Sequence, residues 1–149
     1  MTTVTSPLAG RAVGLAGVPE AVFSAGLVGP GTAIDPVREP SEAVSPIDGV
    51  VVSLQPQAFV VVDIQGHSVL THLGIDTVQL NGAGFEPLVY KGDKVVRGQP
   101  IVRWNPVDVE TAGKSPISPV VALEAAADAL TGIVEDGDLA VGDPLFTWK

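Results

Sequence analysis

The string Ser45-Pro46-Ile47-Asp48-Gly49 leads directly into the apolar run Val50-Val51-Val52. An echo of it stands near the start of the sequence, where Ser6-Pro7-Leu8-Ala9-Gly10 precedes apolar residues at the same spacing. A second pair of echoes, residues 92–104 and 137–148, repeats glycine, aspartate, proline and tryptophan in the same order. Glycines on either side of a short apolar strand suit tight turns that need positive φ. These repeats predict a folded-over scaffold, and convergent hairpin sequences and an ancient duplication both account for them.

Short apolar runs bounded by turn residues recur along nearly the whole sequence, for example at residues 59–62 and 100–102. Val, Leu, Ile and Ala supply most of the 46% apolar content, and aromatic residues make up 5%, a balance that favours strands. With 17 glycines and 13 prolines among 149 residues, long helices are not expected. The one segment that reads as a helix is the alanine-rich stretch 122–130, with Gly132 as its cap. The pattern predicts an all-β sandwich or barrel.

Composition excludes several classes of protein. A formal net charge of −9 argues against binding to nucleic acid or to an anionic membrane surface. The absence of cysteine excludes disulfides, thiolate zinc sites and cysteine nucleophiles. The first residues do not have the pattern of a secretory signal, and no apolar run approaches the roughly 18 residues that span a bilayer. We therefore expect a soluble, cytoplasmic protein.

Both histidines, His67 and His72, lie in the stretch 66–78. Residues five apart on a strand point to opposite faces, so the two imidazoles are not expected to share a site. His67 follows Gly66 and is predicted to be a solvated loop residue. His72 lies among apolar residues, a pattern usually typical of a core histidine. The following Asp76 and Thr77 shift this interpretation only a little towards a nucleophile, because a carboxylate or carbonyl near one ring nitrogen makes the other more nucleophilic.

The sequence becomes recognisable at His72-Leu73-Gly74-Ile75-Asp76-Thr77-Val78-Gln79-Leu80 and Gly82-Ala83-Gly84-Phe85. This stretch resembles the phosphohistidine signature of glucose-type enzyme IIA, a component of the phosphoenolpyruvate-dependent sugar phosphotransferase system. Further strings resemble the same family: Ser6-Pro7-Leu8-Ala9-Gly10, Val18-Pro19-Glu20-Ala21-Val22-Phe23, Gly29-Pro30-Gly31-Thr32-Ala33-Ile34, Pro46-Ile47-Asp48-Gly49 and Ser118-Pro119-Val120-Val121. The resemblance implies one domain over residues 1–149. Its fold would be an antiparallel β-sandwich of barrel-like form, a duplicated hybrid motif with one or two short helices.

The resemblance also implies a function. His72 would receive a phosphoryl group from the carrier protein HPr and pass it to the IIB domain of a sugar permease, with Asp76 and residue 57 in the same site. Regulatory target proteins are further possible partners, and contact with the membrane would run only through the permease. A mostly apolar docking face would contain Val22, Phe23, Leu27, Val28, Phe59 and Leu70.

One departure from the family concerns residue 57. The family has a second active-site histidine fifteen residues before the phosphorylated one, whereas this sequence has Gln57, followed by Ala58-Phe59. The position two residues earlier, usually threonine in the best-known members, is Gln55. A glutamine amide donates a hydrogen bond to a phosphoryl oxygen, but it neither becomes positive nor shuttles a proton. We expect slowed onward transfer, no bound metal and no cofactor. The alternative is a regulatory, partner-binding relative with inefficient phosphotransfer.

Two readings from other classes have less support. Residues 91–100 look like the glycine-aspartate hairpin of biotinyl and lipoyl carrier domains. Those domains present a lysine in a tight symmetric turn beside methionine, but the only methionine here is Met1. A zinc peptidase needs at least three ligands and an open position, which two histidines on opposite faces do not provide.

Overall fold

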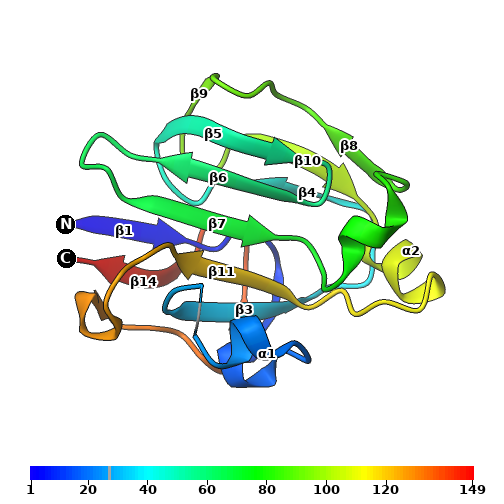
Figure 1. Cartoon of the computed structure of the whole chain (residues 1–149), viewed down its shortest axis with the longest axis horizontal. Coiled ribbons are helices and arrows are strands. Elements are labelled where there is room, and N and C mark those ends of the chain that lie inside the picture. Colours follow the sequence, from blue (N-terminus) through cyan, green and yellow to red (C-terminus); the bar gives the residue numbers. More distant parts are fainter. Residues whose placement is uncertain (27) are drawn as a thin grey trace.

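Antiparallel strands dominate the computed structural model, which describes residues 1–26 and 28–149 (Figure 1). The strands are β1 (Thr2–Thr5), β2 (Gly10–Ala12), β3 (Gly31–Pro36), β4 (Ser41–Val44), β5 (Gly49–Gln55), β6 (Ala58–Val62), β7 (Ser68–His72), β8 (Phe85–Pro87), β9 (Lys94–Val95), β10 (Pro100–Trp104), β11 (Ser118–Ala122), β12 (Leu130–Thr131), β13 (Asp138–Leu139) and β14 (Pro144–Trp148). The helices are α1 (Ala21–Ser24), α2 (Pro106–Thr111) and the 3-10 turns η1 (Leu15–Gly17), η2 (Thr77–Leu80) and η3 (Ala127–Ala129).

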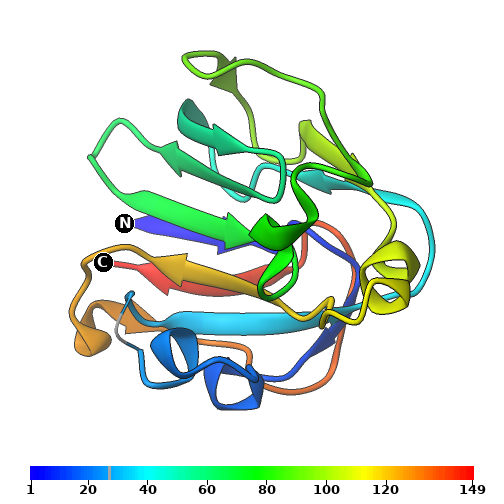
Figure 2. The same cartoon turned by 45° about the vertical axis from the view of Figure 1, so that its right-hand side comes forward.

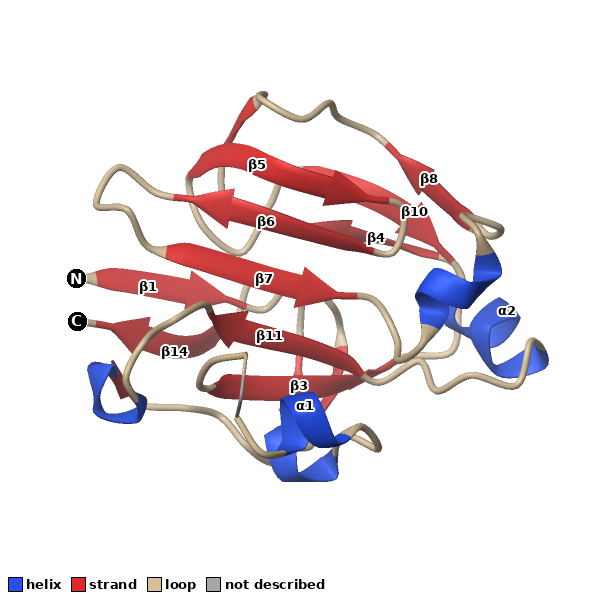
Figure 3. Cartoon of the chain, viewed as in Figure 1, coloured by secondary structure: helices blue, strands red, loops and turns tan. Residues whose placement is uncertain are grey.

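The strands form three sheets. The largest has the order β13-β2-β3-β11-β7-β6-β5-β9, and two smaller sheets have the orders β1-β14-β12 and β4-β10-β8. Side chains from all three sheets meet in one apolar core, which includes Phe59 of β6, Ile101 of β10 and Phe146 of β14. Figure 3 shows how little of the fold is helical. The expected antiparallel β-sandwich with few short helices is confirmed.

The two ends of the chain lie side by side. Strand β1 pairs antiparallel with β14, so that Thr2 is the partner of Trp148. Figures 1 and 2 show both ends at the left-hand edge of the sheets, and the right-hand end of β7 points away from them. The start of β7 therefore lies near the ends of the chain and its last residue lies far from them.

The repeated strings form matching contacts that cross one another. The amide of Thr5 donates to the carbonyl of Pro46 at 3.0 Å, and the amide of Val44 donates to the carbonyl of Pro7 at 3.1 Å. In each string the proline carbonyl thus accepts a hydrogen bond from the residue that precedes the serine of the other string. Proline has no N–H, so its carbonyl is the backbone group that it offers to such a crossing.

The serines of the two strings have equivalent roles. The hydroxyl of Ser6 donates to the carbonyl of Leu8 at 2.6 Å, and the hydroxyl of Ser45 donates to that of Ile47 at 2.7 Å. Both serines are fully buried. The carbonyl of Ser6 accepts from the amide of Gly142 at 3.0 Å, and the carbonyl of Ser45 accepts from the amide of Gly98 at 2.9 Å. These two glycines occupy matching positions in the second pair of repeats. The sequence repeats therefore correspond to repeated three-dimensional contacts.

The helix predicted at residues 122–130 is wrong. Ala122 ends β11, where it pairs with Val69, and Glu124 has a left-handed φ of 60° that no α-helix continues. Only Ala127–Ala129 forms a 3-10 turn before β12 begins. Alanine is the strongest helix former, but helix propensity is a weak determinant, and burial of Ala122 between strands outweighs it.

The α-helices occur where local caps favour them. Helix α2 starts with Pro106 after Asn105, whose side chain accepts from the amide of Val107, and helix α1 starts after Glu20, which accepts from the amide of Val22. Among residues 1–26 and 28–149, no helix is both long and apolar enough to cross a membrane.

We expect Ser45→Ala to lower the free energy of unfolding by about 1 kcal/mol, because the buried Ile47 carbonyl loses a donor. Ser6→Ala is expected to do the same at the matching position. Urea denaturation measures both. The control is Ser53→Ala in β5, whose half-exposed side chain should change stability by less than about 0.5 kcal/mol. Equal losses in Ser45→Ala and Ser53→Ala would contradict the role of the buried hydroxyl.

Candidate functional site

His72 is the last residue of β7, in the middle of the large sheet. Along this strand Val69 and Thr71 are buried, whereas Leu70 and His72 are half-exposed. Strand geometry places alternate residues on one face, so Leu70 and His72 share the outer face of the sheet. The imidazole thus lies where a second protein can reach it.

A backbone carbonyl fixes the tautomer of His72. Its Nδ1 lies 2.6 Å from the carbonyl oxygen of Gly74. A carbonyl only accepts hydrogen bonds, so Nδ1 carries the proton and Nε2 is unprotonated in the neutral ring. The sequence indicates a carboxylate or a carbonyl for this role, and the structure has the carbonyl. Asp76 is exposed, with a left-handed φ of 58°, and does not make this contact.

Gly74 is the residue that lets this carbonyl turn back to the ring. Its φ of +81° lies in the left-handed region, which side chains disfavour. A Cβ at this position would lie 2.7 Å from Cγ2 of Thr77 and 2.9 Å from the carbonyl oxygen of Ser115. Both the backbone conformation and the close neighbours therefore require glycine here.

Gln57 lies beside the same end of β7, in the turn between β5 and β6. It precedes Ala58, the cross-strand partner of His72, and its carbonyl accepts from the amide of Leu73 at 2.7 Å. The residue is 7% exposed. The structure thus brings Gln57 and His72, two of the three sequence-predicted site residues, to one end of the large sheet.

Helix α1 covers part of the His72 ring. The rings of Phe23 and His72 are 5.5 Å apart between centroids and tilted by 59°. Phe23 also packs against a small apolar cluster of Val18, Ala33 and Ile75. This packing withdraws the imidazole from water without closing it off. The sequence analysis did not assign Glu20 to the site. Its side chain caps α1 and places a carboxylate near the His72 ring. An acidic residue directly before a short helix is a sequence pattern that could have indicated this cap.

Burial lowers the pKa of the His72 imidazole below its ordinary value of 6.5. The hydrogen bond to the Gly74 carbonyl and the charges of Asp76 and Glu20 act in the opposite direction, towards a higher pKa. The ring is therefore neutral near pH 7, with a free nitrogen for nucleophilic attack, and its surroundings are ready to stabilise a positive charge once one forms.

The proposed docking residues fall into three groups. Val22 is 45% exposed on α1, and Phe23, Val28 and Leu70 are half-exposed. Phe59 is a correction: it is fully buried in the core and pairs with Thr71, on the face of the sheet opposite His72. Strand alternation, not hydrophobicity, decides its side of the sheet. Leu27 lies outside the described residues.

His67 lies in the loop before β7, as predicted, but the prediction that its side chain is solvated is wrong. Its ring stacks on Trp148 at 4.3 Å, and its Nδ1 lies 2.8 Å from the hydroxyl of Thr2. That hydroxyl donates to Asp63 at 2.5 Å. These contacts join the start of β7 to the two ends of the chain, which no local pattern around residue 67 could indicate. His67 and His72 lie at opposite ends of β7 and do not meet.

No group of three His, Asp or Glu side chains within residues 1–26 and 28–149 is placed to hold a metal ion.

Comparisons with known proteins place the chain among the phosphotransferase components of sugar uptake. The sequence model of a family described as phosphoenolpyruvate-dependent sugar phosphotransferase system, EIIA 1, matches residues 2–127, and the chain belongs to this family. It is a phosphocarrier of that system.

Individual relatives agree with the family. The glucose-specific EIIA component of Staphylococcus aureus is 36% identical over 142 residues, covering 94% of this chain and 84% of that protein. The β-glucoside-specific EIIBCA component of Bacillus subtilis is 38% identical over 120 residues, which are 79% of this chain but only 19% of that protein. The structure of glucose permease IIA from Mycoplasma capricolum superposes with a TM-score of 0.88 at 29% identity, over 97% of this chain and 93% of the other.

We expect Phe23→Ala to raise the pKa of His72 towards its ordinary value. Burial is what depresses this pKa, and removal of the neighbouring ring admits water that stabilises the charged imidazolium. NMR titration of the His72 ring protons measures the midpoint. Val22→Ala on the same helix is the matched control and should leave it unchanged, because Val22 is 45% exposed. A midpoint that falls or stays constant in Phe23→Ala would show that Phe23 does not shield the ring.

Proposed function

We propose that Nε2 of His72 accepts a phosphoryl group from HPr and passes it to the IIB domain of a sugar permease. The observation that carries this proposal is the half-exposed, neutral imidazole whose Nδ1 proton is held by the Gly74 carbonyl. Family membership supports the same assignment. A IIB partner is further supported by relatives named EIIBCA components.

The proposed step needs little from the protein beyond positioning. In the first transfer, the bond between phosphorus and the donor breaks as the bond from phosphorus to Nε2 of His72 forms. In the second transfer, the bond from phosphorus to Nε2 breaks as a bond from phosphorus to the acceptor group of the IIB domain forms. The imidazole becomes positively charged on phosphorylation. The Gly74 carbonyl retains the Nδ1 proton, and the carboxylates of Glu20 and Asp76 favour the charged ring.

Apolar side chains on the outer face of the sheet, from His72 towards the start of β7 where Val28 lies, supply the proposed docking face. Val22, Phe23, Val28 and Leu70 are the members among the described residues. Apolar contact with a partner excludes water from the transferring phosphoryl group and so limits its hydrolysis. We propose the same face for HPr and for the IIB domain, since both must bring a reacting group to one nitrogen.

Residue 57 sets the expected efficiency of this carrier. Gln57 lies at the same end of the sheet as His72 but offers only a neutral amide. We propose that the Gln57 amide still helps to bind the phosphoryl group, but that transfer from His72 to the IIB domain is slow. The alternative, a regulatory relative that binds partners without efficient transfer, follows from the same residue. A cytoplasmic location belongs to the proposal, because the carrier must share a compartment with its phosphoenolpyruvate-dependent donors.

His72 is expected to be the sole phosphorylated residue. Incubation with phosphoenolpyruvate, enzyme I and HPr should add one phosphate to the wild type by intact mass, labile to acid and stable to base. His67→Ala should keep this gain and His72→Ala should lose it, because only His72 lies on the outer face. Circular dichroism checks that both variants fold. Phosphate uptake by His72→Ala would overturn the assignment.

Gln57→His is expected to speed transfer from the phosphorylated protein to a IIB domain. General acid–base assistance is typically worth roughly 10²–10⁴-fold in rate, and part of it is already supplied here by positioning. The final amount of phosphate on His72 should not change. Rapid-quench measurement of both proteins decides the matter, with Gln55→His two residues earlier as a control. Equal rates in wild type and Gln57→His would mean that residue 57 only shapes the site. Activity too low to measure in the wild type but restored in Gln57→His would favour the regulatory alternative.

A further inference from the structure

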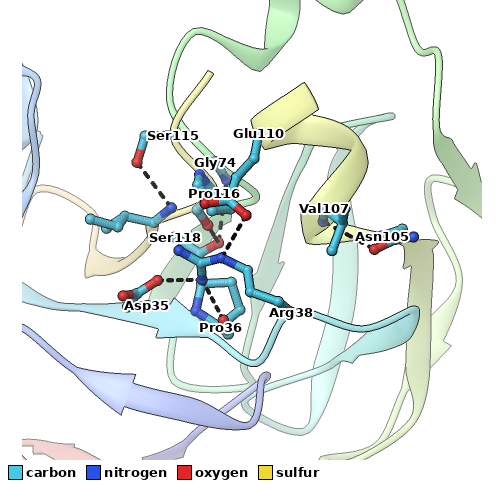
Figure 4. A network of polar contacts seen from close by, with 11 residues as sticks. Asp35, Pro36, Arg38, Gly74, Asn105, Val107, Glu110, Ser115, Pro116 and Ser118 are labelled. Atoms are coloured by element: carbon cyan, nitrogen blue, oxygen red, sulfur yellow. Dashed lines mark hydrogen bonds and ion pairs between the residues drawn. The ribbon is translucent and has the colours of Figure 1, made fainter. Parts of the chain in front are cut away.

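The backbone that orients His72 is itself held by a distant segment, residues 115–118. Two peptide groups join Gly74 to Leu73 and to Ile75, and in both of them the N–H and the C=O form hydrogen bonds. Figure 4 shows Gly74 beside Ser115, Pro116 and Ser118, with Arg38 and Glu110 next to them. This segment precedes and enters β11, the strand next to β7.

The peptide group between Gly74 and Ile75 carries the contact to the imidazole. Its carbonyl accepts from Nδ1 of His72 at 2.6 Å, and its amide donates to the carbonyl of Ser115 at 2.9 Å. Ile75 and Ser115 form an isolated antiparallel bridge. Hydrogen bonds in a chain polarise one another, so the Ser115 contact makes the Gly74 carbonyl a better acceptor.

The preceding peptide group, between Leu73 and Gly74, is held by two hydroxyls. The amide of Gly74 donates to Oγ of Ser118 at 3.3 Å, and the carbonyl of Leu73 accepts from Oγ1 of Thr77 at 2.8 Å. Ser118 donates its own proton to the carbonyl of Pro116 at 2.9 Å. Its lone pair is therefore directed at Gly74, and the hydroxyl cannot turn away without breaking this bond.

Ser118 is well placed to be rigid. It is fully buried, lies between Pro116 and Pro119, and pairs with Ile34 of β3. Prolines on both sides fix φ and limit local motion. Nearby, Arg38 binds Asp35 and Glu110 and so ties the end of β3 to α2. Residues 115–118 thus form a rigid support that fixes the orientation of the two Gly74 peptide groups.

We infer that Ser118 is a positioning residue for phosphoryl transfer, acting through the Gly74 peptides to keep the proton of His72 on Nδ1 and leave Nε2 free. The inference deepens the proposed function and rests on it. Without the hydroxyl, the Gly74 amide loses its partner, the carbonyl moves relative to the ring, and the Nε2–H tautomer becomes populated. That tautomer has no free electron pair at Nε2, the ring nitrogen that does not face the Gly74 carbonyl.

The test compares Ser118→Thr with Ser118→Val, which have the same shape but differ in the hydroxyl. NMR of the ¹⁵N-labelled His72 ring reads the tautomer, and rapid quench reads phosphoryl uptake from phosphorylated HPr. Ser118→Thr should keep the Nδ1–H tautomer and the wild-type rate. Ser118→Val should contain both tautomers and lose roughly 2- to 10-fold in rate, the effect of one hydrogen bond. Ser118→Ala repeats the comparison without added bulk and should behave as Ser118→Val.

The outcomes separate the two proposals. The inference is overturned if Ser118→Val and Ser118→Ala keep the wild-type tautomer and rate, or if the wild-type ring is protonated on Nε2. The tautomer measurement needs no phosphoryl donor. A wild type that takes up no phosphate would therefore count against the proposed function, whereas a tautomer that still depends on the Ser118 hydroxyl would leave the positioning contact supported.

Discussion

The crossing of the two Ser-Pro strings is the contact on which the arrangement of the sheets depends. Thr5 binds Pro46 and Val44 binds Pro7 through backbone hydrogen bonds, so the segment around each string completes the other. Backbone groups buried at such a crossing need partners, and the reciprocal pattern supplies them without side chains. From this crossing β5 leads outward, and its hairpin with β6 provides the neighbour that aligns β7. His72 occupies its position on the outer face because that register is fixed.

The site combines two opposing electrostatic requirements. In the proposed function, the accepting imidazole must be neutral to attack phosphorus, and the phosphorylated ring must tolerate a positive charge. Burial beside Phe23 serves the first requirement, and the Gly74 carbonyl with two nearby carboxylates serves the second. Since the carbonyl also selects the tautomer, one glycine with left-handed backbone links the fold to the chemistry.

Local sequence patterns predicted the strands well and the packing between distant segments poorly. The alternation of apolar and polar residues and the turn residues of each hairpin act over a few residues, which is why the sheet class could be derived. The same local pattern at residue 72 was typical of a core histidine, and only the family resemblance indicated a reactive one. Burial of Ala122 in a strand, stacking of His67 on Trp148 and the support of Gly74 by Ser118 join residues tens of positions apart. The side of the sheet taken by Phe59 required a register that hydrophobicity alone does not define.

The pairing of β1 with β14 has a consequence for how such a unit is tethered. A linker attached at either end leaves from the same edge, beside Thr2 and Trp148, while His72 lies at the far end of β7, about 13 Å further along the strand. A tether at this edge would therefore leave the opposite end of β7, where His72 lies, uncovered. A protein linked in this way would have a raised local concentration at this unit without covering the His72 ring.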